Sequence, residues 1–200
     1  MNRYQIDTLF SFPVLSTTIN YKFDKGEEEF LLDTEFESNE LNSISKDRNV
    51  LNNNELRSLR RWLLEHLSNY TYNILQYKNI DPYITQSWVN RTNLNESHHT
   101  HNHVNCFISG VFFISEGDSN IRLIRKDDMF PVSPQIKEYN ILNSGSWDYA
   151  TEKGKLLLFP STVNHCVRTQ FLDKPRYSLS FNTWVRGELG NENNYNYLKL

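Results

Sequence analysis

This chain of 200 residues has few of the features that mark membrane or secreted proteins. No apolar run approaches the roughly 18 residues that a membrane-spanning helix needs, and the first residues lack the apolar core of a signal peptide. Only two cysteines occur, Cys106 and Cys166, which is too few for a disulfide framework. We therefore expect a cytoplasmic protein whose cysteines are small buried side chains in a reducing compartment.

An excess of charge of either sign is also missing. The 21 Lys and Arg residues stand against 24 Asp and Glu residues, for a net charge of -3. Nucleic-acid binding rests largely on basic side chains that neutralise phosphates, so this balance argues against a nucleic-acid partner. The basic cluster Arg57, Arg60 and Arg61 lies in a predicted helix, where we expect it to form a solvated face. The length suits a single domain, 1–200, with a core of its own.

The chain does contain a series of short β-rich segments. Strands are predicted over residues 83–90, 106–114, 121–124, 156–159, 163–167 and 177–185. A helix is predicted over residues 54–76, from apolar residues three or four apart, with an N-cap among residues 52–54. Residues 9–19 suggest an opening strand or strand pair bent at Pro13, and segments 91–97 and 126–150 suggest loops, the second with one short strand. Many short strands separated by turns are typical of a β-sandwich or β-barrel.

Four of the six histidines fall within six residues, His98, His99, His101 and His103, and a fifth, His165, lies on a later apolar segment. Alternate residues of a strand share a face, so we expect His101 and His103 to project together. Neutral imidazole is the commonest side-chain metal ligand, and a pair at i, i+2 with one distant histidine can hold a metal in a β-barrel. A flexible exposed histidine loop and a structural His165 are the alternatives, and the first explains His98 and His99 well.

The last predicted strand alternates polar and apolar side chains. Its polar members are Arg176, Ser178, Ser180 and Asn182. They suit an amphipathic outer strand, or equally a strand whose polar face points into a barrel mouth. In the second case Arg176 is a planar, bidentate donor to a carboxylate, with the Ser178 hydroxyl beside it.

Five blocks of the sequence carry a family resemblance in their order along the chain. They are Leu9-Phe10-x-x-Pro13-Val14, Ser87-Trp88-Val89-Asn90, His101-x-His103-x-Asn105-Cys106-x-x-Ser109-Gly110-Val111-Phe112-Phe113, Gly154-x-Leu156-x-Leu158-Phe159-Pro160-Ser161-x-x-x-His165-x-Val167 and Arg176-x-Ser178-x-Ser180-Phe181-Asn182. In these blocks the chain resembles a family of 2-oxoglutarate/Fe(II)-dependent oxygenases of marine bacteria and phages. Val104 and Cys106 replace the Pro and Ser that this family uses at those positions.

The resemblance implies a mainly β fold with flanking helices, a double-stranded β-helix (jelly roll, cupin-like) with the metal at its open end. Residues 83–186 would form this core, residues 1–80 an N-terminal strand with helical support, and residues 187–200 a tail. The resemblance carries over His101, His103 and His165 as metal ligands, and Arg176 with Ser178 as the anchor for the distal carboxylate of 2-oxoglutarate. It also places Asn90, Asn105 and Asn182 in the co-substrate pocket. If the source is a phage, the expected location of the protein is the host cytoplasm.

The ligand set departs from the wider superfamily, which uses two histidines and one carboxylate. Here the middle ligand would be His103, and neither Glu96 nor Glu116 stands at the i+2 position. Three neutral imidazoles leave the metal ion at its full charge, which dianionic 2-oxoglutarate would neutralise. They also leave coordination positions open for the keto acid and O2. Three histidines also suit zinc, so the sequence leaves the choice between iron and zinc open.

Three functions are therefore compatible with the sequence. The leading hypothesis is a hydroxylase-type Fe(II)/2-oxoglutarate oxygenase acting on a small-molecule or protein substrate. The second is a cupin-like metalloenzyme that does not use 2-oxoglutarate and has no need of the Arg-x-Ser pair. The third is a non-enzymatic jelly-roll binding or structural protein, in which aromatic residues such as Trp147 and Trp184 form stacking surfaces.

Overall fold

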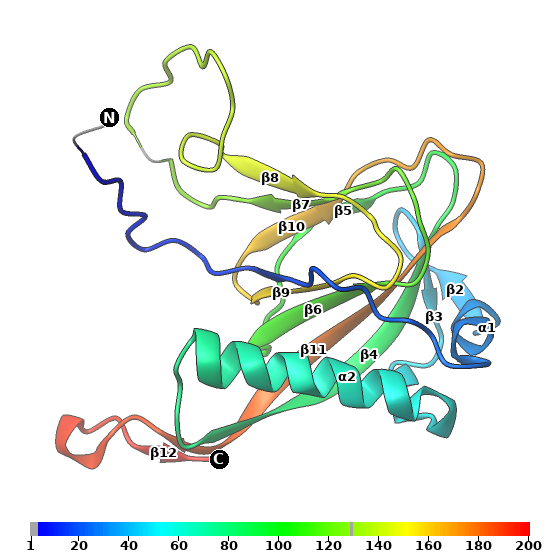
Figure 1. Ribbon diagram of the computed structural model, residues 1–200, viewed down its shortest axis with the longest axis horizontal. Coiled ribbons are helices and arrows are strands. Elements are labelled where there is room, and N and C mark those ends of the chain that lie inside the picture. Colours follow the sequence, from blue (N-terminus) through cyan, green and yellow to red (C-terminus); the bar gives the residue numbers. More distant parts are fainter. Residues whose placement is uncertain (1–3, 129) are drawn as a thin grey trace.

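The computed structural model describes residues 4–128 and 130–200 (Figure 1). Two parts of the predictions lie outside the described residues. They are residues 1–3 of the predicted single domain and Met129 of the predicted loop 126–150. The helical elements are α1 (Glu27–Leu32), η1 (Val50–Asn52), η2 (Asn54–Leu56), α2 (Arg57–Asn69), the π-helical η3 (Tyr70–Ile74) and η4 (Glu192–Asn194). The strands are β1 (Leu15–Ser16), β2 (Phe36–Ser38), β3 (Ser43–Ser45), β4 (Ile80–Thr92), β5 (His98–His101), β6 (Ile108–Phe113), β7 (Ile121–Ile124), β8 (Ser146–Tyr149), β9 (Leu156–Pro160), β10 (Asn164–Val167), β11 (Arg176–Leu189) and β12 (Leu198–Lys199).

The strands form two antiparallel sheets, as the jelly-roll prediction requires. The large sheet has the order β1-β9-β6-β11-β4-β3-β2, with β12 paired to β11, and the small sheet has the order β5-β10-β7-β8 (Figure 1). From β4 to β7 the strands alternate between the sheets: β4 and β6 belong to the large sheet, and β5 and β7 to the small one. The predicted strands 106–114 and 121–124 therefore do not form a hairpin, because the chain changes sheet between them. The fold class is confirmed as mainly β with the double-stranded β-helix architecture.

The central strands of the large sheet are apolar throughout because both of their faces are buried. On β6, Phe112 packs on the helix side of the sheet, whereas Val111 and Phe113 pack between the two sheets. On β9, Leu158 and Phe159 divide between the same two cores. Buried sheets with two covered faces read as continuous hydrophobic runs, and these segments follow that rule.

Helix α2 covers the outer face of the large sheet (Figure 1). Its buried stripe is Leu59, Leu63 and Leu67, at the spacing that predicted the helix. The predicted asparagine cap does not form: Leu56 precedes α2, and Asn53 makes no side-chain capping bond. The backbone N–H of Leu59 instead donates to the buried Glu27 carboxylate, 3.0 Å away, so a long-range contact takes the role of a local cap.

Three further segments differ from the sequence prediction. Residues 9–19 contain only the two-residue strand β1. Strand β4 extends beyond 83–90 at both ends, through Pro82 and as far as Thr92. Pro82 is tolerated because β3 pairs with β4 only at Asn90 and Arg91, so the missing N–H of Pro82 faces an unpaired edge. The predicted tail, 187–200, includes the pairing of β12 with the end of β11.

The expectation of two buried cysteines holds for one of them. Both cysteines are free, but only Cys106 is buried, whereas Cys166 is partly buried. Arg57, Arg60 and Arg61 are exposed on α2. Within residues 4–128 and 130–200, none of the helices has the length and apolar character needed to cross a membrane.

Candidate metal and co-substrate site

Two strands of the small sheet bring three histidines together. His101 ends β5 and pairs directly with His165 on β10. His103 lies two residues beyond the strand, where its backbone N–H donates to the Ser161 carbonyl, 3.1 Å away. One ligand nitrogen from each ring lies within 4.8 Å of the other two. The predicted trio thus meets in space, although His103 is placed by a turn after β5 and not by the strand itself.

The hydrogen bonds of these rings decide which nitrogen is free. In each ring, Nδ1 faces a carbonyl-type oxygen: that of His99 for His101, that of Val163 for His165, and the Asn182 side chain for His103. An Nδ1–H that donates to such an acceptor leaves Nε2 unprotonated, with its lone pair directed away. The Nε2 atoms of His101 and His103 are 3.2 Å apart. Two ring nitrogens that converge at this separation can share a cation, so the donor set fits a metal ion.

Burial keeps these imidazoles neutral. Removal from water lowers the pKa of His165 to about 3, and it also lowers the pKa values of His101 and His103. The neighbouring imidazoles lower each pKa further, because two positive charges cannot be accommodated at this separation. Neutral imidazole is the form that binds metals, so the site needs no deprotonation before binding at neutral pH.

Asn182→Ala should weaken metal binding by about 10- to 100-fold, the usual effect of losing a partner that orients a histidine ligand. The Asn182 side chain accepts a hydrogen bond from His103, and Ala removes that acceptor. Asn182→Asp keeps an acceptor at this position and should retain metal affinity. Calorimetric titration with Ni(II) measures both variants against Asn102→Ala, which alters an exposed asparagine nearby. An Asn182→Ala protein with normal metal affinity but weakened 2-oxoglutarate binding would instead support the pocket role expected from the sequence.

Arg176 begins β11 and is fully buried, with 0% of its surface exposed. Its Nε donates to Thr151 Oγ1 at 3.3 Å, and its Nη1 donates to Ser178 Oγ at 3.1 Å. No carboxylate of the described residues forms a salt bridge with it, and Nη2 is buried without a partner. Burial lowers the pKa of Arg176 to about 10, so the guanidinium is still charged at neutral pH. A buried, unpaired charge is costly, and this one fits an anionic ligand.

The polar face of β11 points into the jelly roll. Ser178 and Ser180 are buried on that face, whereas Leu179 and Phe181 pack in the opposite, helix-side core. The amphipathic outer strand is therefore excluded. Gly117 lies beside the anchor, where a Cβ would stand only 2.8 Å from Arg176 Cγ. The absence of a side chain at residue 117 gives the stem of Arg176 its room.

Two of the unpartnered polar atoms on the neighbouring strand β4 belong to alternate residues, Asn90 and Thr92. Register places Asn90 beside Ser178 and Thr92 beside Arg176. Asn90 Nδ2 donates to Ser180 Oγ at 3.0 Å, but Asn90 Oδ1 and Thr92 Oγ1 are buried without a partner. Buried polar atoms are normally hydrogen-bonded. These atoms, together with Nη2 of Arg176, are available to hydrogen-bond a polar ligand.

The other predicted pocket residues behave differently. Asn105 is exposed and adopts a left-handed conformation (φ 52°) in the turn before β6, which suits a turn role. Asn182 lies against His103, as described above. Sequence reasoning missed Thr92, Thr151 and Gly117. Thr92 could have been found, because alternate residues of a strand share a face and Thr92 follows Trp88 and Asn90 at this spacing. Thr151 and Gly117 come from loops distant in the sequence, where no local pattern marks them.

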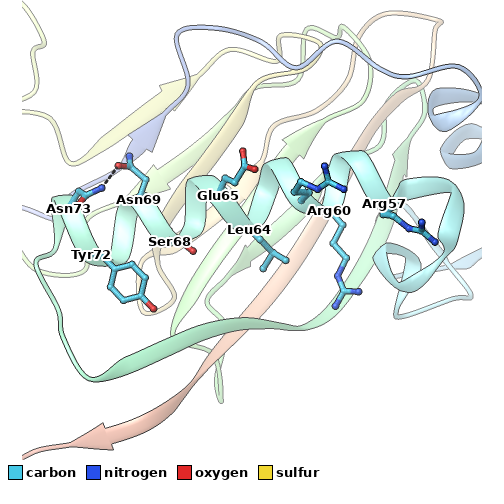
Figure 2. Close-up of a pocket in the computed structure, with 9 residues that line it drawn as sticks. Arg57, Arg60, Leu64, Glu65, Ser68, Asn69, Tyr72 and Asn73 are labelled. Atoms are coloured by element: carbon cyan, nitrogen blue, oxygen red, sulfur yellow. Dashed lines mark hydrogen bonds between the residues drawn. The ribbon is translucent and has the colours of Figure 1, made fainter.

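A separate hollow lies on the outer face of α2, away from the histidines (Figure 2). Its lining comes from one helix and its extension: Arg57, Arg60, Arg61, Leu64, Glu65, Ser68, Asn69, Tyr72 and Asn73. The labelled side chains in Figure 2 fan outwards from the helix and do not converge on a common point. This solvated face has none of the features of the histidine site.

The comparisons with known proteins agree with this geometry. A family model described as "Putative 2OG-Fe(II) oxygenase" matches residues 86–182. No curated protein sequence matches the chain. Among solved structures, an oxidoreductase of the 2OG-Fe(II) oxygenase family from Burkholderia pseudomallei aligns with TM-score 0.60 and 13% identity, over 85% of this chain and 83% of that one.

Two further structures are similar over their length. HygX from Streptomyces hygroscopicus, with nickel, 2-oxoglutarate and hygromycin B bound, aligns with TM-score 0.60 and 12% identity over 85% of this chain and 82% of that one. A prolyl-4-hydroxylase from Pseudomonas putida aligns with TM-score 0.58 and 12% identity, over 90% and 95%. At such low identities the likeness establishes a shared fold.

Proposed function

We infer that this protein is a 2OG-Fe(II) oxygenase, a 2-oxoglutarate-dependent dioxygenase with iron as its metal and O2 as its second co-substrate. The family-model match over the jelly-roll segment and the fold of the similar structures indicate this enzyme class. One observation in the chain itself carries the inference furthest. Three converging imidazole rings and a buried guanidinium that lacks a carboxylate partner among the described residues lie in the same jelly roll.

We propose that His101, His103 and His165 hold the iron through their Nε2 atoms, with Asn182 fixing the His103 ring. Arg176 and Ser178 would bind the distal carboxylate of 2-oxoglutarate. The orphaned Nη2 of Arg176 supplies the second donor of a bidentate pair. Asn90 and Thr92 would contact the same ligand from β4. Exposed Asn105 is left out of this set.

Iron supplies the oxidative chemistry of this class, in which O2 and 2-oxoglutarate yield succinate, CO2 and an oxidised substrate. The residues of this chain supply binding and exclusion of water. The imidazoles are neutral donors, so the dianionic co-substrate balances the charge of the metal. The apolar wall of Val111, Phe113 and Phe159 lines the interior between the sheets and keeps the site dry.

The sequence resemblance extends the proposal in three directions. The substrate is a small molecule or a protein side chain that is hydroxylated. The source is a marine bacterium or a phage, and the location is the cytoplasm, or the host cytoplasm for a phage. Two free cysteines suit such a reducing compartment.

Anaerobic titration with Fe(II) and then 2-oxoglutarate tests the proposed function. We expect a visible metal-to-ligand charge-transfer band that needs both components, and succinate formation once O2 is admitted. Metal binding without the band would favour a cupin-like enzyme that does not use 2-oxoglutarate. A protein that takes up no metal would be a non-enzymatic jelly roll.

A further inference from the structure

A second group of three histidines lies at the edge of the small sheet. The inner trio is the set of proposed iron ligands, His101, His103 and His165. The outer trio is His98, His99 and His101, which also offer ligand nitrogens within 4.8 Å of one another. Its members all belong to β5, the first strand in the order β5-β10-β7-β8 and therefore an edge strand (Figure 1). His101 is a member of both trios.

His101 packs as closely on the outer rings as on the inner ones. Its ring centroid lies 4.6 Å from that of His98 and 5.2 Å from that of His99. The corresponding distances to the rings of His165 and His103 are 4.3 and 5.2 Å. The centroids of His98 and His99 are 4.9 Å apart, which closes the outer group. The five rings thus form one unbroken cluster of imidazoles, in which His101 links the two trios.

Exposure to water falls along this cluster from the outer trio to the inner one. The side chain of His99 is 41% exposed, whereas His165 is only 4% exposed. His98 and His101 are partly buried and lie between these limits. An ion that approaches from the edge of β5 therefore meets the nitrogens of the outer trio before it reaches the buried ones.

A carboxylate prepares His99 for metal binding. Nδ1 of His99 lies 3.1 Å from Glu40 Oε2. An Nδ1–H that donates to this carboxylate leaves Nε2 as the ligand atom, an arrangement that is common among metal-binding histidines. Glu40 is itself exposed, so it also adds a negative charge that attracts cations to this part of the surface. Imidazole suits first-row divalent ions, among them Fe(II), Ni(II) and Zn(II).

The outer trio is less well organised than the inner one. Each inner ring has its Nδ1 fixed by an oxygen atom, whereas no hydrogen bond from residues 4–128 or 130–200 holds the ring of His98. Loss of an orienting partner typically weakens metal binding by about 10- to 100-fold. His101 has only Nε2 to offer, because its Nδ1 is bonded to the His99 carbonyl at 2.9 Å. One ion at a time can therefore use His101, and the inner trio should bind that ion more tightly.

We propose that the outer trio is a metal-capture site, which takes a divalent ion such as Fe(II) from solution and passes it to the inner trio. The inference rests on the proposed function, which assigns the iron to the inner trio. His101 stays bound during the transfer, while His98 and His99 are replaced as ligands by His103 and His165. All of these ligands are neutral imidazoles, so the exchange requires no proton transfer.

The rate at which the metal-free protein takes up Ni(II) tests the capture site. In the wild type this rate should rise with Ni(II) concentration and then level off, because transfer becomes limiting once the outer trio is saturated. His99→Ala removes a capture ligand but keeps the backbone carbonyl that His101 uses. At low Ni(II) its uptake should be about tenfold slower or more, without levelling off. Quenching of tryptophan fluorescence reports the uptake, since the Trp88 ring lies 5.9 Å from that of His103.

The final affinity for Ni(II) separates capture from ordinary ligation. His99→Ala should bind Ni(II) as tightly as the wild type at equilibrium, so release of the ion to a chelator should slow by the same factor as uptake. The matched control is His66→Ala, whose ring lies on α2 against Trp62, and both of its rates should equal those of the wild type. Uptake by His99→Ala at the wild-type rate would overturn the capture site. Equilibrium affinity that falls as much as the uptake rate would also overturn it, and would make His99 a ligand of the final site.

The outer trio can also be measured without the inner one. In His165→Ala, calorimetry should detect one residual Ni(II) site, about 100-fold or more weaker than that of the wild type. Addition of His98→Ala should weaken this residual site by a further tenfold or more, whereas addition of His66→Ala should not change it. Equal binding by His165→Ala with and without His98→Ala would show that the outer trio holds no ion.

The capture site and the proposed function fail in different ways. If His99→Ala takes up Ni(II) normally and the loaded wild type binds 2-oxoglutarate, the capture site is wrong and the oxygenase function stands. If His99→Ala takes up Ni(II) slowly but the loaded wild type binds no 2-oxoglutarate, the capture site stands and the oxygenase function is wrong.

Discussion

Arg176→Met should weaken the binding of 2-oxoglutarate to the metal-loaded protein by about 30-fold or more. Loss of one partner from a buried, hydrogen-bonded charge pair costs about 2–5 kcal/mol, and each 1.4 kcal/mol is about a factor of ten. The guanidinium is fully buried, with Nη2 free for the ligand, so water cannot replace it readily. Calorimetry with Ni(II) in place of Fe(II) measures this loss in the absence of turnover.

The same variant separates a binding role from a structural one. Without ligand, Arg176 is a buried charge that lacks a carboxylate partner among the described residues, and replacement of such a charge by an apolar side chain is commonly neutral or stabilising. We therefore expect the melting temperature of ligand-free Arg176→Met to equal or exceed that of the wild type. Addition of 2-oxoglutarate should raise the melting temperature of the wild type but not that of the variant.

Arg186→Met is the matched control, because Arg186 lies on the same strand but is exposed and stacks over Tyr83. This control should bind 2-oxoglutarate normally. If Arg176→Met bound it as tightly as the wild type, Arg176 would not be the anchor. A melting temperature far below that of the wild type would instead assign Arg176 to the stability of the fold.

His165→Ala should reduce metal affinity by at least about 100-fold. A four-ligand zinc site contributes about 10–16 kcal/mol, or about 3 kcal/mol for each ligand if the ligands are equivalent, and this amount exceeds two factors of ten. The same loss is expected for His101→Ala and His103→Ala, since each ring offers one ligand nitrogen within 4.8 Å of the others. Calorimetry with Ni(II) and determination of the bound metal measure the effect.

His66→Ala is the control for this series. Its ring lies on α2 against Trp62, outside the jelly-roll interior, so the metal affinity should be unchanged. A chelator should lower the melting temperature of the wild type and of His66→Ala, but it should not affect the three ligand variants. Tight, stoichiometric metal binding by His165→Ala would show that the ligand set is wrong.

Much of the fold could be predicted because its signals are local. The continuous apolar runs of β6 and β9 reflect strands with two buried faces. The spacing of Leu59, Leu63 and Leu67 reflects a helix with one buried face. Boundaries were less predictable. Proline at residue 82 suggested a strand end, but an unpaired neighbouring edge lets β4 run through it. Residues 9–19 have β-like composition and still form only β1, because a strand needs a partner that local sequence does not specify.

The candidate site divides in the same way between sequence and tertiary structure. Residue type and alternation alone determined that His101, His103, His165, Arg176 and Ser178 are the residues to consider, because imidazole and guanidinium chemistry belongs to the side chain itself. Tertiary structure decided the rest. A register shift between β5 and β10 accompanies the stacking of His98 on His101, and Asn182 contacts His103 from another strand. Burial left Arg176 charged without a carboxylate partner among the described residues, and its Nη2 unbonded. These features depend on register and on exclusion of water between two sheets, which arise only when segments distant in sequence pack together.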